Sequence, residues 1–137
     1  VPIGTRSNVI LETDNFKEIS QLLQNIELEN KGYEDIIGKA KKGDLLFVDP
    51  PYTVKHDNNG FIKYNEILFS WDDQKSLSRC LKAAKKRGAT IIHTNANNRL
   101  IRELYKDYFK IIPVTRKSII AADPANRDKC NELIITN

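Results

Sequence analysis

The chain has 137 residues, enough for one domain with a hydrophobic core and too few for two. Apolar residues make up 40% and charged residues 29%, which is typical of a globular protein, and apolar runs of about four residues are too short to cross a membrane. The net charge of +4 gives weak support for a polyanionic partner.

The N-terminus shows no secretory signal pattern, so we expect a cytoplasmic protein. The sequence contains no methionine and begins with Val1-Pro2, which we interpret as a piece of a longer protein. Cys80 and Cys130 lie far apart, and neither histidine, His56 or His93, forms a ligand pattern with them. We therefore predict no metal site.

The first elements are weakly marked. Residues 8–11 are compatible with a short strand. A helix is predicted from Phe16 to Gln24, because Asn15 can cap it and apolar residues recur at helical spacing. Residues 26–29 alternate between apolar and acidic side chains, which predicts a strand.

A short helix is predicted from Tyr33 to Lys41, ended by Gly43. The apolar run Leu45 to Val48 follows and is closed by Asp49. This pattern is typical of a parallel strand that is covered on both faces and carries a polar residue at its carboxyl end. Residues 53–69 form a stretch too long for a simple connection, so we expect a functional loop there.

The second half alternates between helices and strands. Ser70 and Asp73 have capping-box spacing and predict the start of a helix that Gly88 ends. Further elements are expected as a strand over 90–95, a helix over 97–107, and strands over 109–115 and 132–136 that pair like a hairpin. Strands alternating with helices predict an α/β sheet with right-handed crossovers.

Chemistry is indicated where the apolar strand ends. In open α/β sheets ligands bind beyond the carboxyl ends of the strands, where Asp49 is expected. Pro50 and Pro51 keep the backbone extended and donate no N–H, and Tyr52 offers a flat face. A carboxylate and a carbonyl can accept both hydrogens of one amino group while the ring stacks on a planar base. The four residues therefore predict a site for the amino group of an extruded nucleobase.

Asp49-Pro50-Pro51-Tyr52 resembles the catalytic motif of S-adenosylmethionine-dependent amino-methyltransferases, and the rest of the chain resembles the Dam-type (D12 class) DNA adenine methyltransferases. Besides this motif, the resemblance is carried by Val1-Pro2-Ile3-Gly4, Gly32-Tyr33, Gly43-Asp44, Asp73-Gln74 with Leu77, Asn95 and Asn131-Glu132-Leu133-Ile134. Gly32 stands where the family usually has an acid, and the family's glycine-rich cofactor loop is absent.

The resemblance implies an incomplete Rossmann-like S-adenosylmethionine-dependent methyltransferase sheet, with parallel strands, flanking helices and a C-terminal antiparallel strand pair. Residues 1–13 would be the end of a target-recognition region and residues 14–137 the C-terminal half of the catalytic domain. The N-terminal half of the same polypeptide would be missing, so we expect the chain alone to be inactive.

The implied reaction is methylation of the N6 amino group of a flipped adenine in double-stranded DNA. The residues implied are Asp49, Pro50, Pro51 and Tyr52 for catalysis, and Gly32, Tyr33 and Asp49 for S-adenosylmethionine. Contacts with DNA would come from Tyr52, Arg116, Lys117, Arg127 and Lys129. We also expect Asn95 to contact cofactor or base, and His93 to be a core residue. Two alternatives stay open: an RNA guanine-amino methyltransferase and a non-catalytic nucleic-acid-binding fragment.

Overall fold

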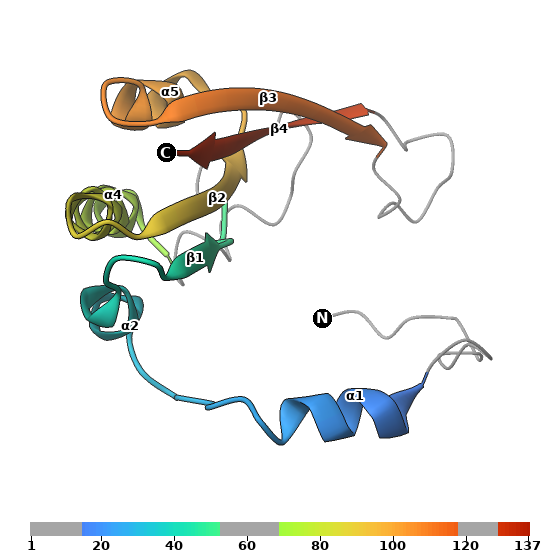
Figure 1. Cartoon of the computed structure of the whole chain (residues 1–137). Coiled ribbons are helices and arrows are strands. Elements are labelled where there is room, and N and C mark those ends of the chain that lie inside the picture. The colour runs from blue at the N-terminus through green and yellow to red at the C-terminus, as the bar shows by residue number, and fades with distance from the viewer. Residues whose placement is uncertain (1–14, 53–68, 118–128) are drawn as a thin grey trace. The chain divides into compact units, whose positions relative to one another are not determined.

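The computed structural model describes residues 15–52, 69–117 and 129–137, and the chain divides into two compact units, Val1–Asn30 and Lys31–Asn137 (Figure 1). In the first unit the described part contains helix α1 (Phe16–Leu23). Its predicted cap is confirmed, since the side chain of Asn15 accepts a hydrogen bond from the backbone N–H of Glu18. Predictions for residues 1–13, the short strand over 8–11 included, lie outside the described residues, as does most of the loop predicted over 53–69.

In the second unit, four strands form one mixed sheet in the described residues. They are β1 (Leu45–Val48), β2 (Thr90–Ala96), β3 (Lys110–Lys117) and β4 (Lys129–Thr136), in the order β1-β2-β4-β3. β1 and β2 are parallel, whereas β4 runs antiparallel to both β2 and β3. The predicted α/β class and the C-terminal antiparallel pair are confirmed.

Three helices lie beside one another on the same side of the strands: α2 (Tyr33–Lys39), α4 (Trp71–Lys86) and α5 (Arg99–Tyr105) (Figure 1). α4 is amphipathic, and its apolar face packs on the sheet. The buried core joins this face to side chains of the strands and of the other helices: Ile37, Leu77, Leu81, Ala84, Ile91, Ile101, Tyr105, Leu133 and Ile135.

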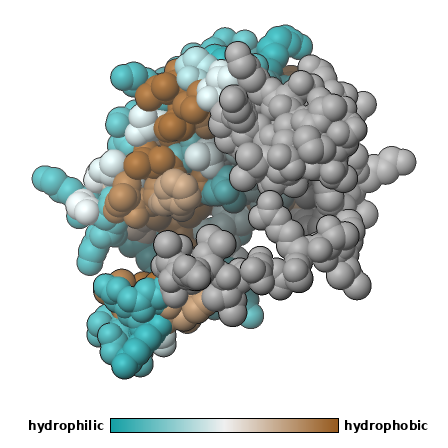
Figure 2. Space-filling model, turned by 90° about the vertical axis from the view of Figure 1, so that its right-hand side faces the viewer, coloured by the Kyte–Doolittle hydropathy of each residue, from teal (hydrophilic) through white to brown (hydrophobic). Residues whose placement is uncertain are grey.

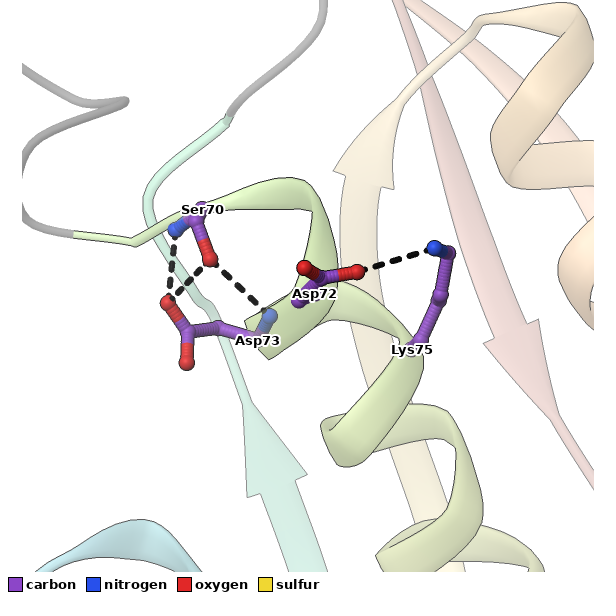
Figure 3. Close-up of polar contacts among 4 residues, drawn as sticks. All are labelled: Ser70, Asp72, Asp73 and Lys75. Atoms are coloured by element: carbon purple, nitrogen blue, oxygen red, sulfur yellow. Dashed lines mark hydrogen bonds and ion pairs between the residues drawn. The ribbon is translucent and has the colours of Figure 1, made fainter.

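The ends of α4 follow the sequence prediction. The Ser70 hydroxyl accepts from the N–H of Asp73, and the Asp73 carboxylate accepts from the N–H of Ser70, as Figure 3 shows. This capping box satisfies two N–H groups that the first helical turn leaves unpaired. Gly88 follows the helix with a φ of +94°, which favours glycine over any residue with a side chain. The segment therefore enters β2 from a defined helix end.

Two sequence predictions are wrong. Residues 26–29 form no strand, and Leu28 is 82% exposed; in the part of the chain described, no strand pairs with this segment, and alternation alone cannot satisfy its backbone groups. β1 is covered on one face only, because Leu46 and Val48 pack against the core while Leu45 and Phe47 are 62% and 68% exposed. The reason is that all three described helices of this unit pack on the same face.

The face of the sheet opposite these helices carries several apolar side chains. The strand register places Phe47 beside Ile92, and Ile134 beside Thr94 and Ile112, all exposed or half-exposed. Apolar surface is also visible in the space-filling view of Figure 2. No helix in the described ranges is long and apolar enough to cross a bilayer.

Candidate functional site

The carboxyl ends of β1 and β2 lie side by side, because Val48 is in register with His93. Asp49 follows β1 directly, and its carboxylate is exposed rather than turned into the core. The hydroxyl of Thr94, on β2, donates a hydrogen bond of 2.6 Å to Asp49 Oδ1. The sequence therefore places the acid correctly at the tip of a parallel strand, and a residue of the neighbouring strand orients it.

The rigid segment after Asp49 has one carbonyl turned toward the protein. Gln74 Nε2, on α4, donates a hydrogen bond of 3.3 Å to the carbonyl oxygen of Pro51. Tyr52 is half-buried next to this segment. Asp49 and Pro50 are consecutive, so a carboxylate and a carbonyl, both hydrogen-bond acceptors, lie close together in this segment.

A pocket of about 400 Å³ opens beside this segment. Its lining is almost entirely apolar, and Asp49 is its only charged residue among those described. The described lining residues come from α2, β1, the segment after β1 and α4: Tyr33, Ile36, Ile37, Leu46, Phe47, Val48, Asp49, Pro50, Pro51, Phe69 and Leu77. A flat apolar group with a polar edge suits such a lining, because its faces would contact hydrocarbon while its edge meets the carboxylate.

Tyr33 lies in the wall of this pocket. Its ring packs edge-on against Phe69, with 5.7 Å between the ring centroids, and its hydroxyl donates to the backbone carbonyl of Asp73. Burial, and then the neighbouring Glu34, raise the pKa of Tyr33 to about 12, so the phenol stays neutral. Gly32 is exposed as the N-cap residue of α2 and is not among the described lining residues.

Beneath the exposed segment lies a buried polar cluster of Gln74, His93 and Asn95, each 0% exposed. Asn95 Nδ2 lies 3.1 Å from Gln74 Oε1 and 3.3 Å from His93 Nε2, and His93 Nδ1 lies 3.1 Å from the carbonyl oxygen of Val48. Burial lowers the pKa of His93 to about 4, against the opposing effects of the Val48 carbonyl and the Asp49 charge. The ring is therefore neutral at pH 7.

His93 is a core residue as predicted. The prediction for Asn95 is wrong in the described structure, because its amide points into the core and bonds Gln74, His93 and the N–H of Ala96. Gln74, which bonds the carbonyl of Pro51, was not predicted to contact this segment. A signal was available, since Gln74, Leu77, Ser78 and Leu81 share helical spacing, which places a glutamine on the buried face of α4.

The basic residues predicted to contact DNA are only partly described. Arg116 and Lys117 end β3, and Lys129 begins β4 in register with Lys117, whereas Arg127 lies outside the described residues. Because Ala96 at the end of β2 pairs with Glu132, the backbone of these three residues extends beyond the same end of the sheet as Asp49. The backbone thus brings basic positions to the edge that carries the candidate site.

Several known proteins and one family model resemble the chain. Residues 1–120 match the model for the D12 class N6 adenine-specific DNA methyltransferase family. A type II methyltransferase of Lactococcus lactis, M1.LlaDCHI, is 31% identical over 100% of the chain and 49% of its own length. The DNA N-6-adenine-methyltransferase of Escherichia phage P1 is 32% identical over 72% of the chain and 13% of its own length.

The type II methyltransferase M.MjaIII of Methanocaldococcus jannaschii is 27% identical over 100% of the chain and 48% of its own length. The chain therefore spans about half the length of M1.LlaDCHI and of M.MjaIII.

Proposed function

Because the chain belongs to the D12 class N6 adenine-specific DNA methyltransferase family, we propose that the complete polypeptide encoded by its gene methylates the N6 amino group of adenine in double-stranded DNA. The observation that carries the proposal is the exposed Asp49 at the tip of β1, next to the Pro50 carbonyl and an apolar pocket. The description of the family and the name of the phage P1 relative both specify N6 of adenine in DNA, which favours adenine in DNA over guanine in RNA as the acceptor.

Asp49 and the Pro50 carbonyl would each accept one hydrogen of the adenine amino group. Two such acceptors draw the hydrogens out of the ring plane, which frees the nitrogen lone pair and positions it for attack. The N–C bond would then form as the bond between the methyl group and its donor breaks, with the electron pair staying on the donor, and the methylated amine would release one proton to water. The Asp49 carboxylate stabilises the positive charge that develops on nitrogen before that proton leaves.

A methyltransferase family needs a methyl donor, and we propose S-adenosylmethionine, whose sulfonium supplies an activated methyl group. The pocket at Tyr33, Ile36 and Val48 fits the flat, weakly polar adenine part of such a molecule, because its walls are hydrocarbon and aromatic. Gly32 would contribute only backbone groups, at the start of α2. The rest of the cofactor site would come from the part of the polypeptide that corresponds to the other half of M1.LlaDCHI and M.MjaIII.

We propose that residues 14–137 form the C-terminal half of the catalytic domain and that residues 1–13 end a target-recognition region.

We propose that four basic residues contact DNA phosphates: Arg116, Lys117, Arg127 and Lys129. Replacing Arg116 and Lys117 together by alanine is expected to reduce the dependence of log Kd on log salt by a slope of about 2. A fluorescence anisotropy titration at several salt concentrations measures this slope; an unchanged slope would remove both residues from the interface.

The central test is replacement of Asp49. In the complete polypeptide, Asp49→Ala is expected to lower the rate of methyl transfer to DNA by at least about 10³-fold, because the acceptor and its charge are both lost. Transfer of tritiated methyl groups from S-adenosylmethionine to a DNA duplex measures the rate. Asp72→Ala is the matched control, since it removes another exposed carboxylate, one that pairs with Lys75. Equal rates for Asp49→Ala and the unaltered protein would exclude the mechanism.

Tyr52 is proposed to stack on the flipped base. Tyr52→Ala is expected to lower kcat by about tenfold, because stacking of a base on an aromatic ring contributes roughly 1–3 kcal/mol. Tyr52→Phe keeps the ring and is expected to stay within about threefold of the unaltered protein. Stopped-flow fluorescence of a 2-aminopurine duplex separates base extrusion from the later chemical step. A similar loss in both variants would mean that the hydroxyl, rather than the ring, matters.

A further inference from the structure

Most of the buried polar side chains lie directly beneath the candidate catalytic segment. Gln74, His93 and Asn95 are three of the four buried polar residues in the described part of the chain, and the fourth is Ser78. Burying a polar group is unfavourable unless it is hydrogen-bonded. A cluster of three, placed beneath Asp49 to Tyr52 and bonded to it, calls for a role beyond packing.

The donor and the acceptor of every hydrogen bond in the cluster can be assigned by starting from the carbonyl of Val48. The Val48 carbonyl can only accept, so His93 Nδ1 carries the proton and His93 Nε2 must accept from Asn95 Nδ2. Asn95 Nδ2 donates its other hydrogen to Gln74 Oε1, and Gln74 Nε2 is then left to donate to the Pro51 carbonyl. Asn95 Oδ1 accepts from the N–H of Ala96, so the orientation of this amide is also determined.

The cluster thus branches from one amide to two backbone carbonyls, those of Val48 and Pro51. These two carbonyls flank Asp49 and Pro50, which present the proposed acceptors. Prolines have no N–H with which to hold this segment, and their rings fix φ but leave ψ free. Since ψ sets the direction of a residue's own carbonyl, the bond from Gln74 fixes ψ of Pro51 and the bond from His93 fixes ψ of Val48.

We propose that Gln74, His93 and Asn95 are positioning residues, which fix both ends of the segment from Val48 to Pro51 so that Asp49 and the Pro50 carbonyl face the same amino group. This inference rests on the proposed function. The three residues act through the backbone and do not touch the base. A shift of about 1 Å in a reacting group can cost about 100-fold in rate, so a segment without N–H donors depends on such bonds.

Variants of Gln74 can distinguish a positioning role from a role in packing alone. Gln74→Met keeps the size of the side chain but loses the donor, and in the complete polypeptide it is expected to lower kcat about 10–100-fold at every pH, with KM for DNA within about threefold. Gln74→Glu can donate to the Pro51 carbonyl only while its carboxyl group is protonated, and burial raises the pKa of that group. Its kcat relative to the unaltered protein is expected to fall at least about tenfold as pH rises from about 5.5 to 8.5.

Tyr105→Phe is the matched control. The Tyr105 side chain is 0% exposed, and its ring packs against His93. Phenylalanine keeps this ring contact, so the variant removes a buried hydroxyl but none of the hydrogen bonds among Gln74, His93 and Asn95. This variant is expected to keep its kcat within about twofold. A flat relative pH profile for Gln74→Glu, or a kcat for Gln74→Met equal to that of the control, would overturn the positioning role.

A second measurement separates this inference from the proposed function. The ¹³C chemical shift of the Pro51 carbonyl, measured by NMR in the complete polypeptide, reports its hydrogen bond without any turnover. Gln74→Met is expected to move it, whereas Tyr105→Phe is not. If the unaltered protein methylates no DNA but this shift moves, the proposed function fails and the hydrogen-bonded network stands. If DNA is methylated and the shift does not move in Gln74→Met, the positioning role fails alone.

Discussion

The carboxyl ends of β1 and β2 are neighbours in one parallel pair, yet they end in opposite ways. Asp49 follows β1 directly, and its exposed carboxylate accepts a hydrogen bond from the Thr94 hydroxyl. Asn95, the second-last residue of β2, has a buried amide that makes three hydrogen bonds within the protein. The exposed group is available to a substrate, while the buried group is fully used in holding its surroundings. Position at a strand end therefore does not by itself make a residue catalytic.

The largest expected effect is on the free energy of unfolding, which should change much more at Asn95 than at Asp49. Asn95→Leu leaves Gln74 Oε1, His93 Nε2 and the N–H of Ala96 without their partner, and it is expected to lower the free energy of unfolding by about 3 kcal/mol or more. Asp49→Asn alters an exposed group and is expected to change it by less than about 0.5 kcal/mol. Urea unfolding of the complete polypeptide measures both. Equal destabilisation by the two variants would contradict the division between an exposed and a buried strand end.

A smaller effect concerns pH, because His93 belongs to the buried end. Its pKa in the folded state is about 4, below the usual 6.5, since burial disfavours the charged ring. The unfolded chain binds this proton first, so the stabilisation is complete above pH 6.5 and is lost as pH falls toward 4. Between pH 7 and pH 5 this group alone is expected to cost about 2 kcal/mol of unfolding free energy.

His93→Gln is the variant that isolates this contribution. It removes the titrating ring, so the difference in unfolding free energy between pH 7 and pH 5 should shrink by about 2 kcal/mol relative to the unaltered protein. Urea unfolding at the two pH values provides the measurement. The same pH dependence in both proteins would show that His93 titrates normally in the fold.

The smallest effect should come from the hydrogen bond between the side chains of Thr94 and Asp49. Thr94→Val removes the hydroxyl that donates to Asp49 Oδ1 and is expected to lower kcat by about tenfold, because a hydrogen bond to a charged group contributes roughly 1.5 kcal/mol. Thr94→Ser keeps the hydroxyl and should stay within about threefold of the unaltered protein. Methyl-transfer kinetics measure both variants; a loss in the serine variant as large as that in the valine variant would assign the effect to packing.

Local features of the fold were predictable from the sequence because they depend on residues a few positions apart. Ser70 and Asp73 start α4 by a reciprocal cap, and Gly88 ends the segment at a positive φ. The apolar run closed by Asp49 becomes a parallel strand with an exposed acid at its tip. The strand predicted over 26–29 was wrong because alternation carries no information about whether a neighbouring strand is present to pair with it.

Asp49 to Tyr52 could therefore be located from the sequence alone, since a strand, an acid and two prolines form a contiguous signal. The residues that hold this segment in place could not be predicted, because their hydrogen bonds link positions that are far apart in the sequence. Gln74 lies 23 positions from Pro51, and His93 lies 45 positions from Val48. Which way Asn95 points depends on which face of β2 the helices cover, and that is decided when α4 packs on the sheet. The sequence by itself determined the acidic strand tip, whereas only the tertiary structure decided which residues hold it.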